Sequence, residues 1–177
     1  LMEQYVKWMP GWENEYWGFN QGTLGILLAL IFLVFIIRLL AMEVVTHIFS
    51  KLAKRSPIAA KTISESRGAL GTAAAAALFW QASEQLTLDI DMAVSSVMMP
   101  NAAAFWLPAL AQLLMLFALL SWALKQVQLI GAVVDWWDDD DELDGTEKTL
   151  ISALESVLRF LIVIFGAILI ANALDFN

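Results

Sequence analysis

The residues that could support catalysis or metal binding are few and lie far apart in the sequence. The chain has no cysteine and a single histidine, His47, which excludes thiolate zinc sites, cysteine nucleophiles and haem held by two histidines. Asp89 and Asp91 are close enough to act as paired carboxylates, but no neighbouring base, nucleophile or ligand completes a catalytic set. We therefore expect no enzyme, cofactor or metal centre, and we interpret the two aspartates as part of a polar loop.

A run of acidic residues from Asp138 to Asp144, followed by Gly145, resembles a calcium-binding loop at first sight. The EF-hand pattern aligned on Gly145 requires Asp or Asn where this chain has Glu142, and a glutamate where it has Ile151. The EF-hand interpretation therefore fails. A solvated connecting loop is the preferred interpretation, and weak divalent-cation binding is the alternative.

The composition indicates a membrane protein. Of the 177 residues, 60% are hydrophobic and 16% are charged, whereas soluble domains have about 45–50% apolar and about 25% charged residues. The net charge of −8 comes largely from the segment 135–147. A negative chain with few basic residues lacks the charge that nucleic-acid binding requires, so we expect no nucleic-acid partner. The fold class that follows is an all-α membrane protein.

Four segments are predicted to form transmembrane helices, because each approaches the length of about 20 largely apolar residues that crosses a bilayer. They are 23–49, 68–86, 102–134 and 146–174. The second is short and rich in small residues, and Gly68, Thr72 and Ala76 at four-residue spacing predict a close helix–helix contact. A re-entrant or buried hairpin segment is the alternative for 68–86.

The remaining segments are predicted to lie at the membrane surface. Residues 1–22 are rich in tryptophan and tyrosine, which collect at membrane–water interfaces. The other segments are a basic loop, an outer loop, an acidic loop and the start of a further loop, at 50–67, 87–101, 135–145 and 175–177. We expect three tryptophans to anchor the chain at the interfaces, namely Trp17, Trp136 and Trp137.

Basic residues predict the orientation. Five of the ten lysines and arginines lie in the 50–67 loop, and short cytoplasmic loops carry the excess of basic residues. This rule places 50–67 and the acidic loop in the cytoplasm and both chain ends outside. We expect a multi-pass protein of the cell inner (plasma) membrane.

Three charged residues within the predicted spans are candidates for structural or lipid contacts. Arg38 can extend towards the headgroups, as arginine side chains near membrane boundaries do, and a functional buried charge is the alternative. Glu155 and Arg159 are four residues apart in the order that favours pairing on a helix. The pair is interpreted as structural, and direct binding of a lipid headgroup by Arg159 is the alternative.

The segment 142–177 resembles the small-conductance mechanosensitive channel family. Its features are an acidic start at Asp144, the basic residue in Leu158-Arg159, an apolar run, and the end Asn172-Ala-Leu-Asp-Phe-Asn177. The resemblance covers about the last fifth of the chain, and the earlier spans are similar to the extra peripheral helices of larger members. It implies a homo-oligomer (a heptamer), a Gly/Ala-rich pore helix after this segment, and a cytoplasmic vestibule.

The chain begins at Leu1 and stops directly after an apolar segment, so we expect a fragment whose pore helix lies beyond Asn177. The function implied by the resemblance is the tension-sensing part of a mechanosensitive ion channel used in osmotic protection, with membrane lipids and further copies of the chain as partners. A transporter subunit and a non-conducting scaffold subunit are the alternatives. A transporter would place ionisable groups and helix breaks at mid-membrane, whereas the charges here lie near span ends.

Overall fold

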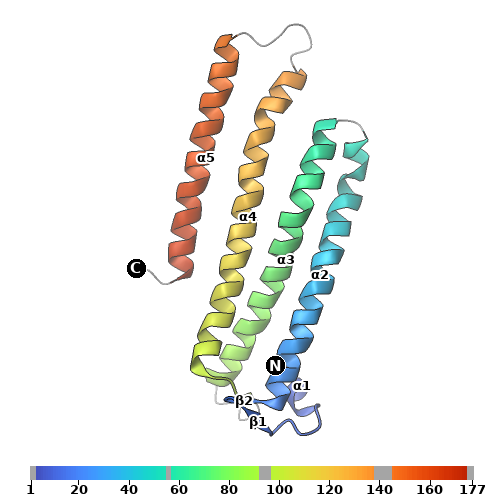
Figure 1. Cartoon of the computed structure of the whole chain (residues 1–177), viewed down its shortest axis with the longest axis vertical. Coiled ribbons are helices and arrows are strands. Elements are labelled where there is room, and N and C mark those ends of the chain that lie inside the picture. Colours follow the sequence, from blue (N-terminus) through green and yellow to red (C-terminus); the bar gives the residue numbers. More distant parts are fainter. Residues whose placement is uncertain (1–2, 55–56, 92–96, 138–144, 175–177) are drawn as a thin grey trace.

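The protein is a row of long antiparallel helices. The computed structural model describes residues 3–54, 57–91, 97–137 and 145–174. Within these parts the long helices are α2 (Gln21–Ala53), α3 (Pro57–Asp91), α4 (Asn101–Trp137) and α5 (Gly145–Ala173). They lie side by side in chain order (Figure 1). The short elements α1 (Glu3–Lys7), β1 (Glu15–Tyr16) and β2 (Phe19–Asn20) lie together at one end of the row, here named the hairpin end.

The helices form a single layer rather than a closed bundle. Helix α3 packs on both α2 and α4, whereas the extensive contacts of α5 are with α4. Helices α2 and α4 end, and α3 and α5 begin, at the end of the row opposite the hairpin end (Figure 1). Because no second layer covers the row, α3 and α4 each lie between two long helices, and α2 and α5 lie at the edges of the row.

Three of the helices, α2, α4 and α5, have segments long and apolar enough to cross a membrane. The segments are Gln21–Ser50, Asn101–Val127 and Gly145–Ala173. The prediction of a mostly helical, multi-pass membrane protein is therefore confirmed. Helix α3 does not meet the same measure, because alanine, serine, threonine and glutamine replace leucine and isoleucine along much of its length.

Helices α2, α3 and α4 are longer than the predicted spans, and the difference is largest for α3. This helix covers 57–91, so most of the basic loop predicted at 50–67 and the start of the outer loop predicted at 87–101 are helical instead. Proline suits the first position of a helix, where its missing N–H has no partner to lose. Ile63 and Ser66 are then buried at helical spacing. The sequence of 57–67 favours a loop because its polar and basic residues and its proline give no continuous apolar run.

Helices α2 and α4 extend past their predicted ends by smaller amounts, and α5 is shifted by one residue. Helix α2 begins and ends outside the predicted 23–49, and α4 extends past the predicted 134 to Trp137. Helix α5 begins at Gly145, one residue before the predicted start, and ends at Ala173. The residues after α5, 175–177, lie outside the described part of the chain.

The N-terminal aromatic segment folds into a compact cap at the start of α2. Strands β1 and β2 pair antiparallel, and the two residues that join them, Trp17 and Gly18, have positive φ of 52° and 79°. Positive φ at both turn positions is the geometry that suits a two-residue hairpin. The hairpin is a structure that the prediction of a surface segment did not include.

Hydrogen bonds join this cap to α2 and to the α3–α4 connection. The Asn20 side chain caps α2 by accepting the Thr23 N–H at 2.9 Å. The Thr23 hydroxyl accepts the Met98 N–H at 3.3 Å, and the Asn20 N–H donates to the Met98 carbonyl at 3.2 Å. Asn20 and Thr23 are both buried. The hairpin end is therefore held by polar contacts between segments distant in sequence.

Small residues bring α3 close to α2. A Cβ at Gly71 would lie 2.7 Å from Met42 Cγ and 3.0 Å from the Arg38 carbonyl oxygen, whereas a Cβ at Gly68 would meet nothing within 4 Å. Ala76 is buried. The prediction that α3 makes close contacts is correct in kind, but the glycine at the contact is Gly71 and not Gly68.

Candidate functional site: an exposed apolar surface

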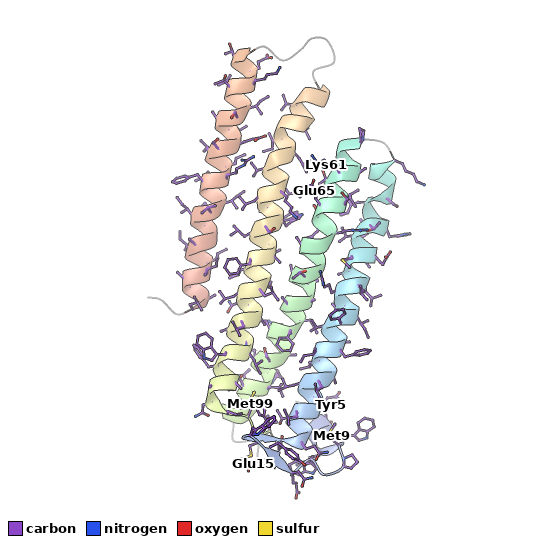
Figure 2. All side chains as sticks on the ribbon, viewed as in Figure 1. Tyr5, Met9, Glu15, Lys61, Glu65 and Met99 are labelled. Atoms are coloured by element: carbon purple, nitrogen blue, oxygen red, sulfur yellow. The ribbon has the colours of Figure 1, made fainter. Side chains whose placement is uncertain are left out.

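Large apolar side chains cover the outside of the helix row. They project from α2, α4 and α5 (Figure 2). More than half of the surface of several is exposed, among them Leu28, Phe32, Phe35, Leu110, Leu114, Phe117, Phe160 and Phe165. A continuous apolar surface of this extent does not persist in water and marks a membrane or protein contact. With the three apolar helices, this surface is the candidate site of interaction with lipid.

Helix α5 exposes apolar side chains along nearly its whole length. Gly166 is its one buried residue within the described chain. A Cβ there would lie 2.7 Å from Leu120 Cδ1 of α4, so the absence of a side chain lets the two helices approach. This agrees with the expectation that small residues in membrane helices mark helix contacts.

The ion pair predicted on α5 is present. Arg159 Nη2 donates to Glu155 Oε2 at 3.1 Å, with 47% of the Arg159 side chain and 20% of the Glu155 side chain exposed. Both residues lie on one helix, one turn apart, so the pair does not join α5 to a neighbour. It lies nearer the start of α5 than the apolar run from Phe160 onwards.

Arg38 lies on α2, and its side chain is exposed. Its backbone carbonyl faces Gly71 of α3, and it lies just past the middle of α2, on the side of Ala53. No acidic residue of the described segments forms an ion pair with it. Of the charged residues singled out from the sequence, Arg38 is therefore a solitary charge beside apolar neighbours.

The predicted tryptophan anchors have different outcomes. Trp17 occupies the hairpin turn with 95% of its surface exposed, a position that suits an aromatic side chain in contact with lipid headgroups. Trp136 and Trp137 form the end of α4, but their side chains lie outside what the structure describes. The roles of all three as anchors stay predictions.

The residues considered for metal or acid–base chemistry do not gather into a site. Asp89 and Asp91 belong to α3 rather than to the polar loop expected for them. His47 is exposed on α2. The acidic run 138–144 lies outside the described residues. In the described segments, no three of the histidines and carboxylates come together as metal ligands would.

Polar contacts between α3 and α4 were missed from the sequence. Near the end opposite the hairpin, Gln126 Nε2 donates to Ser66 Oγ at 2.8 Å and Lys125 Nζ donates to the Glu65 carbonyl at 3.4 Å. At the hairpin end, the Thr87 hydroxyl donates to the Ala104 carbonyl at 3.0 Å. Serine, threonine and glutamine are the residue types that join membrane helices by hydrogen bonds. Which of these residues form pairs depends on the register between α3 and α4, and that register is known only from the folded structure.

Comparisons with protein-family models, curated proteins and solved structures find no match to this chain.

Proposed function

We propose that this chain is the membrane-embedded, tension-sensing part of a mechanosensitive ion channel of the cell inner membrane. The observation that supports it best is the single row of antiparallel helices with apolar side chains exposed along its length. Such a row gains its stability from lipid contact, so changes in the lipid act on it directly. The resemblance of 142–177 to the small-conductance mechanosensitive channel family supports the same conclusion.

In this proposal all four long helices cross the bilayer. Helix α3 is less apolar than the others, and its contacts with α2 and α4 reduce the surface that it presents to lipid. Small and hydroxyl-bearing residues suit such a position, because they pack and form hydrogen bonds against other helices. The basic residues of the described α2–α3 ends, Lys54, Lys61 and Arg67, then lie towards the cytoplasm (Figure 2 labels Lys61).

Tension acts on such a structure through its area in the membrane plane. A conformation that occupies more area is favoured by the product of tension and area change, which shifts the population towards it without a ligand. The extensive contacts of α5 are with α4, so its tilt can change with little repacking of α2 or α3. We propose that α5 passes this movement to a pore helix that follows Asn177, in a homo-oligomer of the chain.

The test is patch-clamp recording of the full-length protein reconstituted in liposomes. Stepwise suction should open channels at a reproducible threshold with no added ligand, and empty liposomes should remain silent. Absence of tension-activated current would contradict the proposal. A solute flux that needs no tension would favour a transporter subunit, and silence in both assays would favour a scaffold.

A further inference from the structure

A groove with apolar walls and one charged end runs between α2, α3 and α4. Its volume is about 450 Å³. Ile31 and Phe79 line it towards the hairpin end, Ala75 and Ala76 form part of its floor, and Arg38 with Thr72 lines the other end. Ala75 and Ala76 are buried. Because these side chains are small, α3 is recessed between its larger neighbours and the groove stays open.

Arg38 is the charged residue of this groove, and it has no ionic partner within 3–54, 57–91, 97–137 and 145–174. Among the described residues no hydrogen bond joins the Arg38 guanidinium to Thr72, whose hydroxyl donates to the Gly68 carbonyl of its own helix at 3.0 Å. A charge left unpaired at membrane depth is costly, so arginines there pair with an anion or extend to the headgroups. The groove thus combines a cation that needs an anion with walls that suit a hydrocarbon chain.

We propose that this groove binds one phospholipid of the cytoplasmic leaflet, with its phosphate on Arg38 and an acyl chain along Ala76 towards Phe79 and Ile31. Guanidinium groups bind phosphate through two parallel hydrogen bonds, which a lysine does not reproduce. We assign the cytoplasmic leaflet because Arg38 lies at the end of the groove nearer Lys54 and Lys61, which are basic residues near the adjoining ends of α2 and α3. This inference rests on the membrane orientation given under the proposed function but not on channel gating. Lipid binding can therefore be measured without recording ion current.

The experiment is native mass spectrometry of the full-length protein released from detergent after titration with phosphatidylglycerol. Arg38→Gln should weaken retention of the lipid about tenfold, as expected for loss of a charge-assisted hydrogen-bonded pair. Leu114→Trp, at an exposed position lining the groove, should weaken it too by narrowing the acyl channel. Arg67→Gln removes an exposed arginine of α3 outside the groove and should leave retention unchanged.

A second titration uses diacylglycerol with the same acyl chains. Its retention should be equal in the unaltered protein and in Arg38→Gln, because it has no phosphate. Equal phosphatidylglycerol retention in the unaltered protein and Arg38→Gln would overturn the proposal. An equal loss in Arg67→Gln would also overturn it, since that result indicates general surface charge. Disulfide cross-linking of copies through Leu114→Cys would show that a second chain covers the groove and would overturn it as well.

Discussion

The three helices α2, α3 and α4 and the fourth helix α5 are joined to their neighbours in different ways. Between α3 and α4, hydrogen bonds from Thr87 and Gln126 fix the register near both ends. Between α4 and α5, the close approach is at Gly166, which meets the side chain of Leu120. The ion pair of α5 stays within α5. The first three helices are therefore a registered unit, and α5 is an attachment to it.

Two glycines show what this difference means physically. At Gly71 the nearest atoms to a new Cβ include a backbone carbonyl oxygen, that of Arg38, which moves only with its helix. At Gly166 they are all atoms of the Leu120 side chain, which can change rotamer. The same residue type therefore marks a rigid contact inside the unit and an adaptable contact at its edge. An adaptable contact suits a helix whose tilt responds to tension.

The largest effect is expected from Gly71→Leu, which tests the rigidity of the unit. The new side chain would overlap Met42 and the Arg38 carbonyl, and overpacking of this kind costs about 1–3 kcal/mol. Thermal unfolding in detergent, followed by tryptophan fluorescence, should show a lower midpoint.

Gly68→Leu is the matched control. It lies one helical turn earlier on α3, where a new Cβ meets nothing within 4 Å. Leucine is also a better helix former than glycine, by about 0.8 kcal/mol. Its midpoint should be unchanged or higher. If both variants unfold alike, α2 and α3 are not held at the spacing described.

A smaller effect on stability and a larger one on gating are expected from Gly166→Leu, which tests the attachment of α5. Leu120 can move aside, so the loss of unfolding free energy should stay near the lower end of the overpacking range, about 1 kcal/mol. The spacing between α4 and α5 must increase, however, and the tension threshold in patch recordings should shift. Ala167→Leu adds the same side chain at an exposed neighbouring position and should leave both quantities unchanged.

The sequence predicted the helices best where their signal was local and apolar. The continuous run in 23–49 and that following Phe160 are long enough to identify α2 and α5 without knowledge of any neighbour. The first turns of α3 carry no such signal, because the buried residues Ile63 and Ser66 stand among polar residues there. Their helical conformation depends on packing against other helices. It could not be predicted from the sequence, because a polar segment has no hydrophobic periodicity.

Contacts within one helix could be predicted from the sequence, whereas contacts between helices could not. The Glu155–Arg159 pair was predictable because its partners are one turn apart on the same helix. The close contact of Gly71, and not Gly68, depends on how far α3 slides along α2, and composition gives no measure of this. The bonds of Thr23 and Met98 join residues 75 positions apart. Such pairings require the fold itself, since many serines and threonines in the sequence are equally able to form them.

The smallest effect is expected from Arg159→Ala, which tests whether α5 is tied to lipid headgroups or only to itself. Exposed ion pairs one turn apart contribute about 0.3–0.5 kcal/mol, reduced further by salt, and the partner here is on the same helix. The unfolding midpoint should therefore change little. The tension threshold of Arg159→Ala should equal that of Glu155→Gln, which also removes the pair. A threshold shift in Arg159→Ala that Glu155→Gln does not share would mean that the guanidinium binds a headgroup. Helix α5 would then be held by the membrane surface as well as by α4, and its freedom relative to the three-helix unit would be smaller than the Gly166 contact implies.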